Sequence, residues 1–251
     1  MLPKIAIQTY KMKLPSTKKE IEYRPYTVKE QNILLMANES EDIQDLIDAT
    51  KKICESCILT DIKVEDLTSF DLQQLFINIR AKSVGETIEM KFRCNNDVVV
   101  GEDTGIETKG KCNTINTYKV DLSKVSVVFP PGHTNEIMVT DSVGIKMKYP
   151  SLASSSVFKK LYEAKNKTQI DLLIELLQSD LDYIYDAEKI YDEYSESELK
   201  DFIETLSLGS LEKIIEFYSS IPYVSYTINY KCSKCEFEET IELKGLQDFF
   251  E

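Results

Sequence analysis

Two cysteines near the C-terminus have the spacing of a metal-binding turn. Cys232 and Cys235 form a C-x-x-C sequence at the tip of a predicted hairpin, with Lys231 and Lys234 beside them. A tight turn of this kind holds two thiolates about a metal ion's width apart, and nearby positive charge lowers the pKa of a thiol. Because a structural zinc ion takes four ligands, this turn predicts half of a zinc site.

A second cysteine pair occurs in the same order of elements. Residues 89–122 and 227–243 both read as strand, cysteine, connector, cysteine and strand, and Cys94 and Cys112 are the pair in the first stretch. If the tips of the two hairpins meet, the four cysteines form a tetrahedral site, so we predict a structural zinc ion that ties the early β region to the C-terminus. Seventeen residues separate Cys94 from Cys112. This loose spacing leaves free thiols and a redox pair as alternatives.

The remaining residues with catalytic chemistry give no support for an enzyme. Cys54 and Cys57 also have C-x-x-C spacing, but they lie on a predicted helix at about 40–58 among apolar residues, which favours core packing. The single histidine, His133, follows a Pro-Pro-Gly loop and is expected at the surface, and one histidine excludes a multi-histidine metal centre. The sequence contains no glycine-rich phosphate loop and no carboxylate pair in an apolar setting.

The elements that must position these cysteines alternate between helix and strand periodicity. Residues 1–85 predict a hairpin and three helices, residues 86–149 predict β-hairpins with a loop at 95–111, and residues 154–220 return to a helical period. A hairpin over 223–243 closes the chain. The pattern predicts an α+β fold in which β-hairpins and a small β body pack with helices. It also predicts a helical C-terminal half and a terminal hairpin that contains cysteines.

The length of 251 residues is compatible with one or two domains. We predict an N-terminal α+β region at 1–150 with the first cysteine pair, and a helical region at 151–251 that closes with a zinc-ribbon-like hairpin. A single compact domain is the alternative. No signal peptide and no apolar run near the ~18 residues of a membrane span occur, so we expect a soluble protein of a reducing cytoplasm without a membrane partner.

Charge is unevenly distributed along the chain. The formal net charge is −13, which argues against a general nucleic-acid binder, yet residues 1–30 carry +4 and residues 180–201 carry −7. Aromatic anchors among steering charges favour a protein–protein contact, and a solvated helix face with half-buried tyrosines is the alternative. The predicted contact residues are Tyr183, Tyr185, Tyr191, Tyr194, Asp182, Asp186, Asp192 and Glu193.

Several segments, spread over most of the chain, together resemble one protein family. They are Leu14-Pro15-Ser16-Thr17, Glu22-Tyr23-Arg24-Pro25-Tyr26, Val28-Lys29-Glu30-Gln31, the stretch from Asp71 to Glu86 with its downstream cysteine, the Cys232/Cys235 turn and Gly245-Leu246-Gln247-Asp248-Phe249-Phe250. These segments are similar to the baseplate hub assembly proteins of T-even-type contractile-tailed bacteriophages. The first cysteine pair departs from the family pattern, because an insertion precedes Cys112.

The resemblance implies a structural or assembly role in the central hub of the phage baseplate, with other hub proteins as partners and no catalytic residues. The protein would act in the host cytoplasm during assembly, either as a factor that leaves or as a component of the virion tail baseplate. Two alternatives remain from the residues themselves. One is a zinc-ribbon nucleic-acid module, for which only Lys231, Lys234 and Lys244 offer positive charge near Cys232. The other is a cell-wall hydrolase of the hub.

Overall fold

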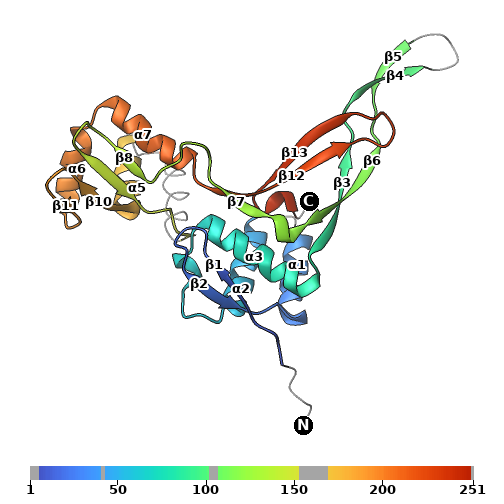
Figure 1. Cartoon of the computed structure of the whole chain (residues 1–251), viewed down its shortest axis with the longest axis horizontal. Coiled ribbons are helices and arrows are strands. Elements are labelled where there is room, and N and C mark those ends of the chain that lie inside the picture. The colour runs from blue at the N-terminus through green and yellow to red at the C-terminus, as the bar shows by residue number, and fades with distance from the viewer. Residues whose placement is uncertain (1–5, 41–42, 102–106, 153–168, 250–251) are drawn as a thin grey trace.

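The computed structural model describes residues 6–40, 43–101, 107–152 and 169–249. Three parts can be followed in Figure 1: an N-terminal body (described residues of 6–85), a lobe (131–152 with 169–219) and an arm (86–101 and 107–121 with 223–249). The lobe and the arm extend to opposite sides of the N-terminal body. The chain is thus a mixed α+β fold, as predicted, built from several small antiparallel sheets.

The N-terminal body is organised around one buried helix. Its elements are β1 (Tyr10–Lys13), β2 (Glu20–Tyr23), α1 (Val28–Glu39), α2 (Ile43–Cys57) and α3 (Ser69–Val84). Helix α3 begins where the Thr68 hydroxyl accepts from the Asp71 N–H, and it ends at Gly85, whose φ of 114° few other residues adopt. Cys54 and Cys57 are fully buried in the core of this body. The prediction that they serve core packing is confirmed.

The start of α1 is stabilised by an ion pair as well as by a capping hydrogen bond. The Thr27 N–H donates to the Glu30 carboxylate over 2.7 Å, and Arg24 pairs with the same carboxylate at 2.9 Å. Burial opposes ionisation of Glu30, but the hydrogen bonds from Arg24 and Thr27 outweigh it and lower the pKa of Glu30 to about 2. Glu30 therefore stays charged although its side chain is almost wholly buried.

The arm consists of two hairpins whose apolar faces pack together. One pairs β3 (Thr87–Arg93) with β6 (Ile115–Asp121), and the other pairs β12 (Tyr223–Lys231) with β13 (Glu238–Lys244). Strand β7 (Ser126–Val128) adds to the free side of β12. Figure 1 shows the two hairpins rising side by side, and residues such as Val120 and Ile228 form the apolar cluster between them.

The loop predicted at 95–111 is a third hairpin. Strand β4 (Asp97–Gly101) pairs with β5 (Glu107–Lys111), and a 2.6 Å ion pair between Asp97 and Lys111 closes its base. The strand signal of Val98, Val99 and Val100 is short and lies among Gly, Asn and charged residues, so the sequence favours a loop at these positions. In Figure 1 this hairpin extends beyond the rest of the arm.

The lobe contains strands as well as helices. Its elements are β8 (Glu136–Met138), β9 (Gly144–Met147), α5 (Gln169–Asp180), β10 (Leu181–Tyr185), β11 (Ile190–Tyr191), α6 (Glu196–Glu204) and α7 (Leu208–Ser219). The sheet order is β11-β10-β9-β8. The prediction of a helical C-terminal half was therefore only partly right, and the beginning of the predicted helical stretch, at 154–168, lies outside the described residues. Because β9 pairs with β10, this sheet joins strands from both sides of residue 150. The division into 1–150 and 151–251 remains a prediction.

His133 lies at the joint between the lobe and the N-terminal body, where it is half-buried rather than at the loop surface. Its ring contacts those of Tyr149 and Phe217 at centroid distances of 5.6 and 5.5 Å, and these two rings lie 5.9 Å from each other, so the three form one aromatic cluster. Tyr149 in turn meets the ring of Phe70 from α3 edge-on at 5.2 Å. Burial lowers the pKa of His133, which favours the neutral ring. The histidine is therefore part of the packing that connects the two parts.

Candidate metal centre

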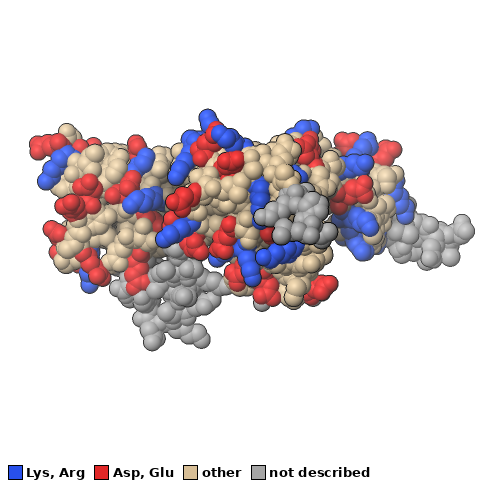
Figure 2. All heavy atoms as spheres, turned by 90° about the horizontal axis from the view of Figure 1, so that it is seen from below, with Lys and Arg blue, Asp and Glu red and all other residues tan. Residues whose placement is uncertain are grey.

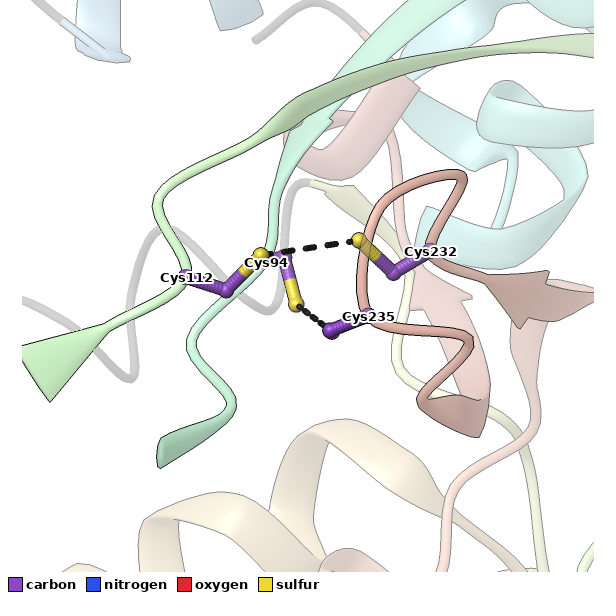
Figure 3. A group of neighbouring side chains, drawn as sticks. All are labelled: Cys94, Cys112, Cys232 and Cys235. Carbon is purple, nitrogen blue, oxygen red and sulfur yellow. Dashed lines mark hydrogen bonds between the residues drawn. The ribbon is translucent and has the colours of Figure 1, made fainter. Parts of the chain in front are cut away.

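The four cysteines of the two predicted pairs meet where the tips of the arm's hairpins touch. Figure 3 shows Cys94 and Cys112 facing Cys232 and Cys235, and all four sulfur atoms lie within 4.8 Å of one another. The Sγ–Sγ distances are 3.6 Å between Cys94 and Cys235 and 3.7 Å between Cys112 and Cys232. Three of the four are buried and Cys235 is half-buried. The structure thus joins cysteines from segments about 140 residues apart.

The sulfur distances match a metal site better than disulfides. A disulfide needs about 2.0 Å between its sulfur atoms, and all four cysteines are free thiols at almost twice that distance. A tetrahedral zinc ion with Zn–S bonds of about 2.3 Å separates its ligand sulfurs by about 3.8 Å. The cluster is therefore compatible with one structural metal ion.

The first turn of the centre, residues 94–96 and 112–114, is a C-x-x-C turn interrupted by the third hairpin. The Cys94 N–H donates to the Thr114 carbonyl over 2.9 Å, and the Asn113 N–H donates to the Cys94 carbonyl over 3.0 Å. The Cys112 N–H reaches the Asn96 carbonyl over 2.9 Å. Asn96 and Cys112 are thus neighbours in space, and the hairpin leaves and rejoins the turn between them.

The second turn, residues 232–237, repeats this pattern without an interruption. The Cys232 N–H donates to the Phe237 carbonyl over 2.8 Å, and the Glu236 N–H donates to the Cys232 carbonyl over 3.0 Å. The residue after the second cysteine has a left-handed conformation in both turns, with φ of 54° at Asn113 and 58° at Glu236. The two turns therefore present their cysteines in equivalent ways.

Backbone N–H groups of the second turn point at the sulfur of Cys232. Those of Cys235 and Lys234 hydrogen-bond to it, with the Cys235 N–H as the largest influence, and they lower the pKa of Cys232 to about 5 although burial opposes this. A thiolate is the form of cysteine that ligates metals. The turn therefore prepares this sulfur for a cation.

In the first turn the pKa values of the two cysteines shift in opposite directions. The hydroxyl and the N–H of Thr114 lower the pKa of Cys112. Burial raises the pKa of Cys94 to about 11, although the Asn96 N–H donates to its sulfur and opposes this. Burial thus favours the neutral thiol at Cys94, and a metal ion bound by the four sulfurs would displace its proton.

Two asparagine side chains, those of Asn96 in the first turn and Asn116 in β6, reach sulfurs of the second turn, although neither was predicted from the sequence as part of the site. Asn116 Nδ2 lies 3.7 Å from Cys232 Sγ, and Asn116 Oδ1 accepts from the Ser233 N–H over 2.9 Å. Asn96 Nδ2 lies 3.7 Å from Cys235 Sγ. The available signal was the alternation of β6, which turns Asn116 inward and leaves a polar side chain buried beside the cysteines.

The predicted contact residues of the acidic segment lie on the β10–β11 hairpin and just after it, not on a helix face. The Tyr183 and Tyr185 rings are 6.0 Å apart and both side chains are half-buried. The ring of Tyr185 covers Gly144 so closely that a Cβ there would overlap it. Tyr194 packs against the core of the lobe. These three tyrosines therefore contribute packing within the lobe.

The outer part of the same segment is exposed. Tyr191 is 38% exposed, and its hydroxyl donates to the Asp186 carboxylate over 2.8 Å. Asp192 and Glu193 are exposed, whereas Asp182 lies 3.4 Å from Lys148. Figure 2 shows that acidic side chains predominate at the end of the molecule formed by the lobe. Binding by these residues remains a prediction.

Similarity to a known family extends over nearly the whole chain. The sequence model of the T4 bacteriophage base plate protein family matches residues 7–251. No curated protein and no solved structure matches the chain. Among the described residues, no helix is long and apolar enough to cross a membrane.

Proposed function

The chain belongs to the T4 bacteriophage base plate protein family, and from this premise we propose that it acts in the central hub of the baseplate by binding other hub proteins. Four of the segments that resemble hub assembly proteins, at 14–17, 22–26, 28–31 and 71–86, support this, because they contact one another in the N-terminal body. The Ser16 N–H donates to the Asp71 carboxylate over 3.0 Å, and the Tyr26 N–H donates to the Ser83 hydroxyl over 2.9 Å. The shared residues therefore build one structural unit. We assign no catalytic step.

We further propose that Cys94, Cys112, Cys232 and Cys235 hold one structural zinc ion. The support is the sulfur spacing near that of a tetrahedral site and the N–H donors aimed at the sulfurs. Four protein ligands leave no open position on zinc, so the role of the ion is to hold the two hairpins of the arm together. Metal analysis of protein purified without chelator should give about one zinc per chain. A folded arm without metal would contradict the site.

The acidic segment at 180–201 is proposed as one contact face toward hub partners. Its exposed members, including Asp192, Glu193 and Tyr191, offer charge that steers a partner and an aromatic side chain that anchors it. The basic N-terminal stretch at 1–30 is proposed as a second face. Opposite charges at separate places orient the protein between its neighbours.

Co-purification with hub proteins tests this assignment. The variant that neutralises Asp182, Asp186, Asp192 and Glu193 to the matching amides should retain less hub protein at physiological salt. The control neutralises four exposed acids elsewhere, Asp45, Glu55, Asp61 and Glu65, and should bind as the unchanged chain does. Equal retention by both variants would remove the acidic segment from the proposal.

Mass spectrometry of purified virions distinguishes the two roles in the hub. A fixed copy number per virion identifies a component of the tail baseplate. Absence from virions, together with failure of the hub to assemble without this protein, identifies an assembly factor. Intact hubs formed without the protein would contradict both roles.

A further inference from the structure

Strand β3 has an edge that no other described strand occupies. It pairs with β6 alone in a two-stranded sheet. At the end of the pair the Cys94 N–H donates to the Thr114 carbonyl over 2.9 Å, which places the even-numbered residues of β3 in the hydrogen-bonded pairs with β6. The N–H and C=O groups of Glu89 and Lys91 therefore point to the open edge. Such a row of backbone groups is a template for a further strand.

A groove of about 350 Å³ runs along this edge and is closed on its other side by α1. It is lined by Leu34, Leu35 and Asn38 of α1, Arg80 of α3, residues 88–91 of β3, and Phe249. In Figure 1, β3 rises from beside α1. A strand edge facing a helix across a groove is the arrangement in which extended peptides dock by strand addition.

Helix α1 presents apolar side chains away from the N-terminal body. Its buried side chains are those of Glu30 and Ala37 only. Leu35 is 53% exposed and Met36 is 72% exposed, and Leu35 lines the groove whereas Met36 does not. An apolar helix side next to an open strand edge offers a peptide both side-chain burial and backbone hydrogen bonds.

The charges of the groove favour an acidic occupant. Arg80 and Lys91 line it, and Arg80 is half-buried there. The third charged lining residue, Glu89, lies 3.9 Å from Lys119. The groove is therefore net positive, in a protein whose overall charge is −13.

The edge of the lobe's sheet at β8 differs from the edge at β3, because side chains of a helix cover its backbone groups. Strand β8 is the last strand of that sheet, and α7 lies along it. Lys213 Nζ donates to the Met138 carbonyl over 2.8 Å, and the Ser210 hydroxyl donates to the Val139 carbonyl over 2.5 Å. No described side chain makes such a contact with the outward groups of β3. The outward N–H and C=O groups of β3 are therefore available to a further strand.

We propose that the groove between α1 and β3 receives an extended segment of another baseplate protein, which adds to β3 as a strand. The segment carries apolar side chains at alternate positions, toward Leu35 and Phe249, and an acidic side chain toward Arg80 and Lys91. The proposal rests on the proposed function in taking the partner to be a baseplate protein. It does not depend on the acidic segment.

Two neighbouring residues of α1 provide a matched test on the full-length, metal-containing chain. Each purified baseplate protein of the same phage, and then overlapping 12-residue peptides of the protein that binds, is titrated against the unchanged chain and two variants. Leu35→Asp should weaken binding by about tenfold or more, and Met36→Asp by less than about twofold. Both residues are exposed, so both variants should fold, and thermal unfolding checks this.

Hydrogen exchange and a proline variant test the strand addition itself. The amides of Glu89 and Lys91 should exchange more slowly in the complex. Lys91→Pro removes an outward N–H without breaking a bond to β6, so it should weaken binding by about tenfold while the arm stays folded.

The outcomes separate this inference from the proposed function. Equal affinities of Leu35→Asp and Met36→Asp, or unchanged exchange at β3, would overturn the groove. If only the variant with four neutralised acids loses the partner, the acidic segment is right and the groove is wrong. If the unchanged chain binds no baseplate protein, both proposals fail. Occupation of the groove by the C-terminal residues of this chain, or by a second copy, also overturns it.

Discussion

The two turns of the cysteine centre reach the same geometry from very different sequences. In the second turn two residues separate the cysteines, and in the first turn seventeen do. Yet the hydrogen bonds that close the turns correspond, from Cys94 to Thr114 in the first and from Cys232 to Phe237 in the second. The inserted hairpin leaves the first turn at a point where its two ends are neighbours.

The difference teaches that ligand spacing along the chain is a poor guide to a metal site when an insertion closes on itself. A hairpin brings its first and last residues together, so Asn96 and Cys112 are hydrogen-bonded neighbours despite the residues between them. The number of intervening residues then affects the entropy of loop closure only weakly. If the turns are equivalent, matched changes in each should have matched effects.

Loss of one cysteine from either turn should have the largest effect. Structural zinc in small domains contributes about 10–16 kcal/mol of apparent binding free energy, and three thiolates do not close the site. Cys94→Ser and Cys232→Ser should each lose zinc. The amides of β3, β6, β12 and β13 should then exchange faster, while those of α3 stay protected, because the N-terminal body has its own core.

Metal analysis and hydrogen exchange measure both effects. Cys54→Ala is the control, because Cys54 is buried in the N-terminal body far along the chain from the centre. It should keep its zinc. If Cys94→Ser retains zinc and Cys232→Ser does not, the two turns are not equivalent and the first pair does not belong to the site.

The asparagines that reach across the centre should show the next largest effect. Asn116→Ala should weaken zinc binding by about 10–100-fold, the usual effect of removing a group that orients a ligand. Asn116 is buried and also bonds Tyr230 and Ser233, whereas Asn96 is half-buried and makes one side-chain contact. Asn96→Ala should therefore have a smaller effect than Asn116→Ala.

Competition with a chromophoric chelator gives the two affinities. Asn95→Ala is the control, because Asn95 is exposed in the same turn. It should bind zinc as the unchanged chain does. A larger loss from Asn96→Ala than from Asn116→Ala would show that the interrupted turn, not the arm as a whole, supports the metal.

Glycine at the left-handed positions should give a smaller change of opposite sign. Glu236 has φ of 58°, a conformation that disfavours most side chains by about 1–2 kcal/mol, so Glu236→Gly should stabilise the arm by about 1 kcal/mol. Asn113 has φ of 54°, but asparagine tolerates this region. Asn113→Gly should therefore gain less, and urea unfolding of both zinc-loaded variants measures the difference.

A glycine elsewhere in the second turn provides the control. Lys234 has no positive φ, so Lys234→Gly should destabilise the arm slightly through the added freedom of the unfolded chain. If Glu236→Gly and Lys234→Gly change the stability in the same direction, backbone strain does not govern the turn.

The cysteine cluster could be predicted because its signals are local. Ligand type, the C-x-x-C turn and the alternating strands around each pair all lie within short stretches of sequence. The hairpin at 97–111 could not be predicted in this way. Its valines form only a short strand signal, and its two strands are brought together by the first turn at their base. The support from Asn116 was visible only as a polar residue at an inward position of β6.

The strands of the acidic segment were missed for a different reason. Leu181–Tyr185 pairs with Gly144–Met147, a partner more than thirty residues earlier in the chain. Such a long-range pairing overrides the local helical pattern, and no residue pattern within 180–201 indicates the pairing. His133 was misplaced for the same reason, because its stacking partners Tyr149 and Phe217 lie on other elements.

Removal of the inserted hairpin should have the smallest effect and is the sharpest test of the comparison. Deleting residues 97–111 joins Asn96 to Cys112 and leaves Cys-Asn-Asn-Cys, which has the spacing of the second turn. The Cys112 N–H already lies 2.9 Å from the Asn96 carbonyl, so the new peptide bond requires little movement. The shorter connection should reduce the entropic free-energy cost of loop closure by about 2 kcal/mol. This gain offsets the lost packing of Val98 against the cysteines.

Zinc affinity of this deletion variant should therefore stay within about threefold of that of the unchanged chain. The matched deletion in the second turn, removal of Ser233 and Lys234, makes Cys232 and Cys235 adjacent and should abolish binding, because neighbouring cysteines cannot form the turn that aims two sulfurs at one ion. Both affinities come from the same chelator competition. Loss of zinc from the first deletion would mean that the hairpin itself holds Cys94 and Cys112 in place. The resemblance between the turns would then be limited to their hydrogen bonds, and the insertion would be a structural part of the centre.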